Sequence, residues 1–383
     1  MTGCGEPPSP PSQSLPTPKF DVEKLTEGLT FAVKMAFLPD GRLLVTEKET
    51  GYVRLVNADF SLQPEPIVDV AVNYFKERGL MGIAVHPAVS QNGYVYIYYV
   101  ASSTGRDSTH PDEIDDIRIA RFQLGGTVGP GGTVGLGGTV GTAMPNIKTL
   151  ISLTAHPGPY HNGGCIQFGP DGKLYVSQGE LNRHVNLISQ IKSSTRGKLL
   201  RYNDDGSIPT DNPLGAKQPA YLLGLRNAFG FAFDPFGEGV FVSDNGPDGH
   251  DKLSAARPGE NLGWPLIWGY ADTWYERPTA WFLGQGYRPP LWESFERRPV
   301  PTAVQVLPDD RYGPAMARRV LMSTFNEGRI LQFALDRGTR NTAVDMGVFL
   351  EGYPTMVDLQ FGPDGSLYVL TINAVYRIKP VET

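Results

Sequence analysis

The sequence predicts an all-β fold, a six-bladed β-propeller made of four-stranded antiparallel blades. The 383 residues include 45 glycines and 33 prolines, so turns interrupt the chain too often for long helices. A hairpin motif recurs six times, and its turns follow one another about every 50 to 80 residues, the span of a four-stranded blade with variable loops. A closed ring of such blades buries the apolar faces that each blade alone would expose.

Each copy of the motif has an apolar pair, a turn of the Pro-Asp-Gly type and an alternating strand, which is typical of a β-hairpin. The first three copies are Ala36 to Gly41 before Arg42 to Glu47, Ala84 to Pro87 with Asn92-Gly93 before Tyr94 to Val100, and Gln167 to Gly172 before Lys173 to Gly179. The last three are Ala232 to Gly237 before Gly239 to Asp244, a degenerate copy at Tyr312-Gly313 before Arg319 to Thr324, and Gln360 to Gly365 before Ser366 to Thr371.

The ring has to close between its two ends. We expect Phe20 to Leu25 to add a strand beside Val375 to Ile378, because an unpaired sheet edge is open to aggregation. The propeller domain would span residues 19–383, after a disordered tether at 1–18. The segment 125–142 repeats Gly-Gly-Thr-Val-Gly with a six-residue period. We interpret it as a flexible surface insertion with no catalytic role, although the repeat also suits a short β-solenoid.

The N-terminal residues look like the end of a bacterial lipoprotein signal. Small residues precede Cys4, and a Pro- and Ser-rich stretch follows it. On this interpretation a lipid on Cys4 tethers the protein to a membrane outside the cytoplasm, in the periplasm or at the cell surface. The alternatives are an upstream start, a trimmed chain, or an exposed thiol in the tail. With Cys165 as its one companion, Cys4 cannot build a disulfide framework or a multi-cysteine metal site.

Composition argues against several classes of partner. The formal net charge is −6, and no Lys/Arg run is interleaved with aromatic residues, so we expect no nucleic-acid partner. No run of about 18 apolar residues occurs, so nothing in the sequence given is expected to span a bilayer. We expect a monomer or a homodimer that acts on a small molecule.

The strongest candidate for chemistry is His161, in the segment Tyr160 to Gly164 directly before the third hairpin. Loops at the mouth of a propeller channel carry functional groups, and two glycines let the backbone approach a ligand closely. Histidine exchanges a proton near neutral pH. Glu180, at the end of the following strand, is placed to accept a hydrogen bond from the imidazole and fix its tautomer. The alternatives are a histidine bonded within a turn and a solvated glutamate.

Two more polar clusters follow along the chain. Arg226 and Asn227 stand directly before the fourth hairpin, a cation and an amide suited to developing oxyanion charge. An arginine paired structurally with a blade-edge carboxylate is the alternative. The segment Ser243 to Asp251 is an acidic, glycine-rich loop whose oxygens suit a hard cation such as calcium, although an ordinary turn has the same composition.

Taken in order, these clusters resemble the soluble quinoprotein glucose/sorbosone dehydrogenase family. The resemblance runs from about Phe31 to Ile378 and is strongest between Tyr160 and Tyr270. It also rests on the segments Glu77 to Gly82, Arg196 to Arg201, Asp205 to Pro213 and Gly259 to Pro265. It implies a six-bladed propeller that binds pyrroloquinoline quinone (PQQ) and Ca²⁺, oxidises the anomeric carbon of an aldose sugar to a lactone, and passes electrons to an external acceptor.

Carried over by position, the resemblance implies roles for individual residues. His161 would be the general base that removes the sugar hydroxyl proton, and Glu180 would orient it. Arg226 and Asn227 would contact the quinone oxygens. The remaining contacts to the cofactor would come from Glu77, Asn245 and Asp251.

The same resemblance implies metal sites. The main-chain carbonyls of Gly246 and Pro247 would hold the active-site calcium, which acts as a Lewis acid. A second calcium site of the family is less complete here. Asp272 is retained, but Lys252 stands where an acidic ligand is expected and Leu262 replaces an aromatic residue.

The sequence departs from the family in the last two blades. Family members hold the three carboxylates of the quinone with a lysine and two arginines from these blades. This chain has Ser323 to Gly328 at the place of the lysine, and Thr355, Met356 and Val357 before a retained Asp358. Since each charge-assisted hydrogen bond contributes roughly 1.5 to 3 kcal/mol, weak or absent quinone binding is one expectation.

Three functional hypotheses follow. The leading one is a PQQ-dependent aldose dehydrogenase. The missing cations support an alternative, a cofactor-free propeller of the same descent that binds a sugar or a protein partner. A calcium-dependent lactonase or esterase fits the acidic loop but not the ordered series of motifs.

Overall fold

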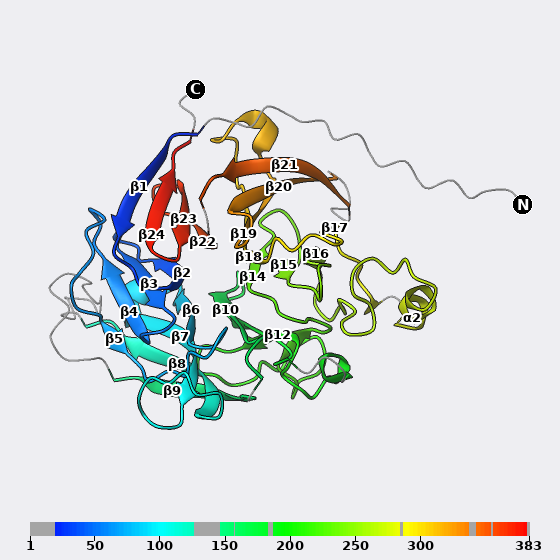
Figure 1. Cartoon of the computed structure of the whole chain (residues 1–383), viewed down its shortest axis with the longest axis horizontal. Coiled ribbons are helices and arrows are strands. Elements are labelled where there is room, and N and C mark those ends of the chain that lie inside the picture. The colour runs from blue at the N-terminus through cyan, green and yellow to red at the C-terminus, as the bar shows by residue number, and fades with distance from the viewer. Residues whose placement is uncertain are drawn as a thin grey trace, which may run out of the picture.

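The structure is a computed structural model that describes residues 20–125, 146–156, 158–182, 187–283, 286–336, 342–353 and 355–380. These residues form six four-stranded sheets around a central axis, with the first strand of each blade nearest to it (Figure 1). Neighbouring strands pair antiparallel in every blade. The predicted six-bladed propeller is confirmed.

The strands follow the blade order of the chain. The first three blades are β2 (Ala32–Phe37), β3 (Leu43–Glu47), β4 (Tyr52–Val56) and β5 (Val68–Asp69); β6 (Leu80–Val85), β7 (Tyr94–Ser102), β8 (Ile114–Gln123) and β9 (Lys148–Thr154); β10 (Gly163–Phe168), β11 (Leu174–Gln178), β12 (Lys198–Tyr202) and β13 (Ala220–Leu222). The last three are β14 (Gly230–Phe233), β15 (Val240–Asp244), β16 (Lys252–Ala256) and β17 (Trp292–Glu293); β18 (Pro301–Val306), β19 (Val320–Thr324), β20 (Arg329–Leu335) and β21 (Ala343–Glu351); β22 (Met356–Phe361), β23 (Leu367–Thr371), β24 (Ala374–Ile378) and β1 (Val22–Glu27). Short helices in the described ranges are α1 (Val89–Asn92), α2 (Glu276–Leu283) and single 3₁₀ turns at Leu187–Gln190 and Pro314–Met316.

All six predicted hairpins join the first and second strands of a blade. Gly41, Gly172 and Gly365 have φ angles of 86°, 72° and 73°, a left-handed conformation that glycine adopts without a steric penalty. The degenerate fifth copy lies in a longer connection. There Tyr312 is buried, and its hydroxyl donates to the carbonyl of Ile378 at 2.8 Å, which ties the fifth blade to the sixth.

The ring closes as predicted, through an N-terminal strand that pairs with β24. The strand begins at Val22 rather than at Phe20. Phe20 instead packs its ring against Phe349 and Tyr312, with centroids 4.4 and 5.7 Å away. An aromatic contact with the fifth blade therefore replaces the first pairing that the sequence pattern suggested.

A buried ion pair links three blades near the axis. Nζ of Lys34, in β2, lies 3.0 Å from Oδ1 of Asp358, in β22. The same ammonium donates to the carbonyl of Thr302, in β18, at 3.1 Å. Asp358, retained where the sequence lacks the expected arginines, is therefore engaged by Lys34.

Some predictions concern residues outside the described ranges. The tether at 1–18 with Cys4, and nearly all of the Gly-rich segment 125–142, belong to this part of the chain. The domain boundaries drawn at these segments remain predictions. Among the described residues, no helix has the length and apolar character needed to cross a membrane.

Candidate active site

His161 stands at the entrance to β10, in a backbone turn that glycines make possible. His161 and Gly163 have φ angles of 64° and 69°, and Gly164 has 113°. A Cβ on Gly164 would lie 2.5 Å from Cβ of Met81 in the second blade, so only glycine allows the two blades to approach this closely. The side chain of His161 is buried in this turn.

Glu180 meets the imidazole from the next strand connection. Its Oε1 atom is in contact with Nδ1 of His161, and the glutamate is completely buried. The backbone holds the two residues together, because the amide of Leu181 donates to the carbonyl of His161 at 3.1 Å. Gly179 leaves room for this approach, since a Cβ there would lie 2.1 Å from the carbonyl oxygen of His161. A carboxylate beside Nδ1 fixes the tautomer and the orientation of the imidazole.

Glu77 connects His161 to the fourth blade. Oε2 of Glu77 accepts the amide of His161 at 2.7 Å and Nδ2 of Asn227 at 3.0 Å. Oδ1 of Asn227 in turn accepts the amide of Gly163 at 3.2 Å. Glu77 and Asn227, predicted to touch a cofactor, therefore also fix the position of the histidine loop.

Hydrogen bonds from its backbone amide and from one nitrogen of its guanidinium hold Arg226 in place. Its amide donates to Oδ2 of Asp244 at 3.0 Å, and Nη1 donates to the carbonyl of Asn245 at 2.8 Å. The guanidinium also lies over the ring of Trp264, 5.4 Å from the centroid. Nε is buried and has no hydrogen-bond partner among the described residues. Burial lowers the pKa of Arg226, while Asp244 acts in the opposite direction.

The acidic loop after β15 is closed by Asp251. Its Oδ1 accepts the amide of Gly246 at 2.8 Å, and its Oδ2 accepts the amide of Val300 at 2.9 Å. Burial raises the pKa of Asp251 to about 6, although these two amide bonds act against the shift. Asn245, directly before Gly246, has a buried Oδ1 with no hydrogen-bond partner in the described part of the chain.

Comparison with known proteins places this arrangement in a family. A family model described as Glucose / Sorbosone dehydrogenase matches residues 29–378, which is most of the chain. The chain belongs to the glucose/sorbosone dehydrogenase family.

Relatives and solved structures are similar over two thirds or more of the chain. An aldose sugar dehydrogenase of Escherichia coli is 25% identical, covering 92% of this chain and 90% of the relative. Quinoprotein glucose dehydrogenase B of Acinetobacter calcoaceticus is 29% identical, covering 66% of this chain and 54% of that protein. The PQQ-bound aldose sugar dehydrogenase of Streptomyces coelicolor superposes with a TM-score of 0.72 at 26% identity, covering 97% of this chain and 99% of that structure.

The predicted metal ligands of this family member are only partly brought together. Gly246 and Pro247 lie in the loop that Asp251 closes, whereas Asp272 is exposed on the segment before α2. Within the described ranges, no group of three or more His, Cys, Asp or Glu side chains is arranged to hold a metal ion. Lys252, at the place of an expected acidic ligand, is buried with Nζ 3.6 Å from Asp244.

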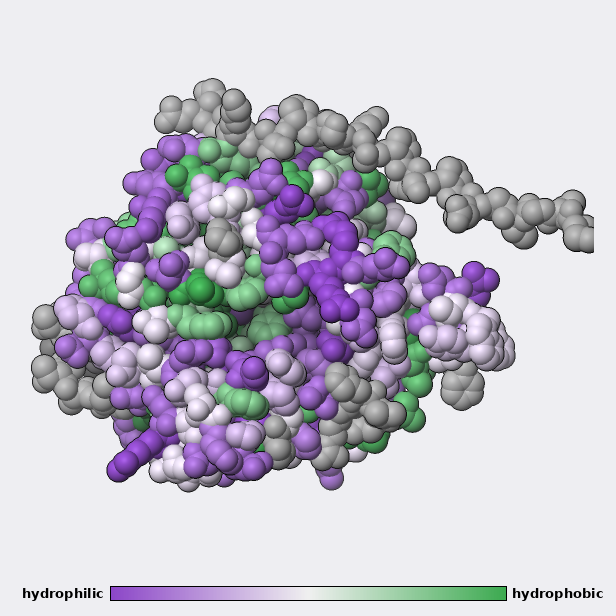
Figure 2. All heavy atoms as spheres, viewed as in Figure 1, coloured by the Kyte–Doolittle hydropathy of each residue, from purple (hydrophilic) through white to green (hydrophobic). Residues whose placement is uncertain are grey.

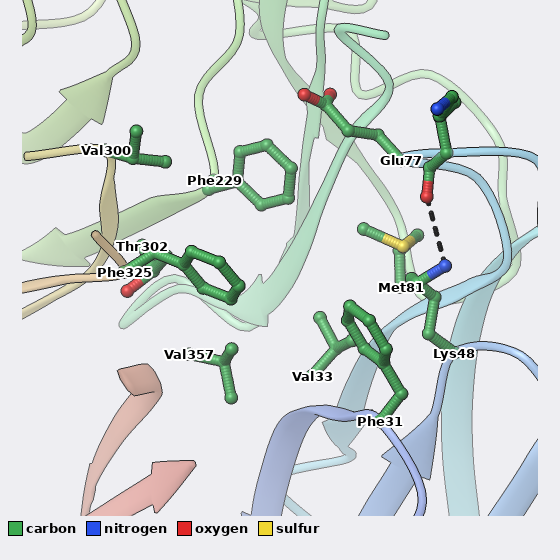
Figure 3. A pocket seen from close by; sticks show the side chains of 11 residues that line it. Phe31, Val33, Lys48, Glu77, Met81, Phe229, Val300, Thr302, Phe325 and Val357 are labelled. Carbon is green, nitrogen blue, oxygen red and sulfur yellow. Dashed lines mark hydrogen bonds between the residues drawn. The ribbon is translucent and has the colours of Figure 1, made fainter. Parts of the chain in front are cut away.

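A pocket at the channel axis borders this site, and we call it the channel pocket (Figure 3). Its volume is about 170 Å³. Its lining consists of Phe31, Val33, Lys48, Lys76, Glu77, Met81, Phe229, Val300, Thr302, Phe325 and Val357. Val357 and Phe325 come from the two segments where the sequence lacks the family's cationic residues.

Sequence reasoning missed several residues of the site. Asp244 accepts the amides of both Arg226 and Asn227, whereas from the sequence it was placed only within the acidic loop suited to a cation. The Arg226 guanidinium lies over the ring of Trp264, which stands 38 positions away in the chain, within the segment Gly259 to Pro265 that contributed to the family resemblance. The position of Asp244, an acidic residue at the end of a strand that follows the Arg226-Asn227 pair, could have predicted its contact with that pair. No local sequence pattern predicts the contact of Trp264.

Proposed function

We propose that this chain oxidises aldose sugars at the anomeric carbon, with His161 as general base and a bound quinone as hydride acceptor. The observation that carries the proposal is the buried contact between Nδ1 of His161 and Glu180, in a member of the glucose/sorbosone dehydrogenase family. Relatives named as aldose sugar and quinoprotein glucose dehydrogenases support the substrate class.

In this proposal His161 takes the proton of the sugar hydroxyl at Nε2. Glu180 is a positioning residue, which holds the ring tautomer and offsets the positive charge that the imidazole gains. Arg226, whose Nε is buried without a hydrogen-bond partner among the described residues, would offset negative charge on the oxygens of a bound acceptor. A bound quinone would supply the two-electron acceptor for the hydride that leaves the sugar carbon.

The residues fit one end of PQQ. Arg226 Nε and Asn162 Nδ2 are buried donors that lack partners among the described residues, and acceptor oxygens would satisfy them. The tricarboxylate end fits poorly, because the adjoining wall of the channel pocket is formed by Val300, Phe325 and Val357. Arg226 and Asn162 are thus the donors proposed to meet the quinone oxygens, and Glu77 and Asn227 are proposed to border the quinone while holding the histidine loop.

We propose calcium at the loop of Gly246 and Pro247. Calcium takes oxygen ligands, including main-chain carbonyls. Oδ1 of Asn245 is a buried acceptor without a donor in the described ranges, as expected for an oxygen beside a cation. Asp251 would act by holding the loop through the Gly246 amide. Asp272 remains a prediction for a second ion.

Titration of the full chain with PQQ, with and without calcium, tests the proposed function. The cofactor absorbance reports binding, and dye reduction is assayed with a panel of aldoses. We expect saturable binding and turnover that requires both quinone and sugar. Quinone binding without turnover of any aldose contradicts the proposal.

Sugar binding with no detectable quinone binding also contradicts it. That outcome would favour the cofactor-free sugar-binding propeller, for which the apolar wall at Phe325 and Val357 is the supporting observation.

A further inference from the structure

The channel pocket is contiguous with the polar site. Glu77, one of its lining residues, accepts hydrogen bonds from the amide of His161 and the side chain of Asn227. Val300, on another wall, donates its amide to Asp251 at 2.9 Å. A molecule in the pocket therefore meets the histidine loop at one end and the acidic loop at another.

The wall of the pocket is apolar over most of its circumference. Figure 3 shows an open centre bordered by Phe31, Val33, Met81, Phe229, Phe325 and Val357. In the space-filling view, apolar residues gather around a hollow near the middle of this face (Figure 2). The volume of about 170 Å³ is comparable with an apolar cavity of about 150 Å³ that binds benzene. The pocket thus has the size and lining to hold an aromatic ring.

The charges on the lining do not suit a polyanion. Nζ of Lys48 lies 3.2 Å from Glu49 and donates to main-chain carbonyls of the segment 74–78, so it is already engaged. Lys76 is exposed, with its ammonium 6.0 Å from the ring centroid of Phe75, and next to it Glu77 brings a negative charge to the same pocket. A carboxylate placed against the phenyl and valine walls would be buried without a partner, which is strongly unfavourable.

We propose that the channel pocket binds the uncharged aromatic ring of the redox partner, so that this chain prefers quinones with few carboxylates over a tricarboxylate. That the bound ring belongs to a redox partner rests on the proposed function, whereas the preference for an uncharged ring follows from the lining of the pocket alone. Met81 and the phenylalanines contact a flat ring through its faces and edges. Specificity comes from the apolar wall that rejects charge, and the polar residues around His161 receive the oxygen-bearing end.

A matched pair of probes tests this preference directly. PQQ and its trimethyl ester share one ring system and differ in the three carboxylates. Dissociation constants for the full chain, measured by quenching of tryptophan fluorescence at one fixed calcium concentration, should show the ester binding at least about ten-fold tighter. Equal binding, tighter binding of the acid, or no binding of either probe would overturn the proposal.

Variants at Phe325 locate the effect in the pocket. Phe325 is only partly buried, so Phe325→Lys should fold, and its ammonium should shift the ratio of the two dissociation constants at least about ten-fold toward the acid. Phe325→Ala should weaken ester binding without helping the acid. The control Val344→Lys adds the same charge at a position 61% exposed on β21 and should change neither constant. A ratio unchanged by Phe325→Lys would overturn the proposal.

Dye reduction with aldoses separates this inference from the proposed function. If the chain oxidises aldoses and binds PQQ more tightly than the ester, the ring preference is contradicted while the proposed sugar oxidation is still supported. Tight ester binding without oxidation of any aldose does the reverse, because the pocket preference would hold while the proposed activity fails.

Discussion

Glu180 and His161 show why single residues of this site depend on one another. A completely buried carboxylate is costly unless a donor meets it, and here the imidazole of His161 meets the carboxylate of Glu180. The two residues flank one predicted hairpin, so their proximity was predictable from sequence. The hydrogen bond that the His161 amide donates to Glu77 was not, because the two residues are 84 positions apart and belong to different blades.

Replacing Glu180 by glutamine tests its role as a positioning residue. Glu180→Gln keeps the shape of the side chain and removes the charge that supports the imidazole, so kcat should fall by about 10²-fold. Quinone affinity and the urea midpoint of unfolding should change little. A proportional loss of stability and activity would instead indicate a purely structural glutamate.

The connection between β11 and β12 is the element that positions Glu180. In Gly179→Ala the new methyl would lie 2.1 Å from the carbonyl oxygen of His161. We expect a loss of about 2 to 3 kcal/mol in the free energy of unfolding, with activity falling further because the glutamate and the imidazole separate. Urea denaturation and turnover measure the two effects.

Gly172→Ala, in the turn of the same blade, serves as the control. Gly172 has a φ of 72° with no atom within 4 Å of the added methyl, so only backbone strain of about 1 kcal/mol is expected. Turnover in this variant should match the native chain. Equal effects of the two substitutions on turnover would show that the crowding at Gly179 has no part in the site.

Lys198 ties the start of β12 to the preceding 3₁₀ turn and predicts a pH dependence. Its ammonium donates to the carbonyls of Ser189 and Arg196 at 2.8 Å and of Ile188 at 3.1 Å. Burial, with the charge of Arg196, lowers the pKa of Lys198 to about 7. Between this value and the ordinary lysine pKa, the unfolded chain holds a proton that the native chain has released. The free energy of unfolding should therefore rise with pH above 7, by up to about 1.4 kcal/mol per pH unit.

Lys198→Met removes this titration. The rise in unfolding free energy between pH 7 and about 10 should flatten in the variant, and urea denaturation over that range measures the slope. Identical slopes in the two proteins would contradict a lowered pKa for Lys198.

The elements differ in how far sequence could predict them. Hairpins with a Pro-Asp-Gly turn were placed correctly, because glycine there satisfies a positive φ that few residues adopt. The closing strand was placed two residues early, since its boundary is set by packing of Phe20 on Phe349 rather than by local pattern. The channel pocket was not predicted as a pocket, because its wall combines side chains from seven separate segments.

The closure of the ring joins the first and last blades through backbone pairing and apolar packing. The β1–β24 pairing joins the two ends of the propeller, and apolar residues of the first and last blades form one buried cluster beside it. The buried pair of Lys34 and Asp358 crosses the same joint near the axis. Opening the closure would expose a sheet edge and this cluster together.

Substitutions at Thr26 in β1 test the closure. Thr26→Val loses only the hydroxyl bond to the carbonyl of Phe60, which measures 2.7 Å, and should cost about 1 kcal/mol. Thr26→Pro also removes a backbone donor within the strand and should cost at least about 2 kcal/mol, with a less cooperative urea transition. If both variants have the same free energy of unfolding, the backbone pairing of β1 at Thr26 contributes nothing to stability beyond the one side-chain hydrogen bond.

The assignment of His161 as the base in a quinone-dependent sugar oxidation is tested most directly by comparing His161→Gln with the native chain in one experiment. Quinone affinity and quinone-dependent dye reduction with the best aldose are measured side by side. Turnover in the variant should fall by about 10² to 10⁴-fold while the quinone dissociation constant stays within about two-fold. Undiminished turnover with the quinone bound would contradict the account.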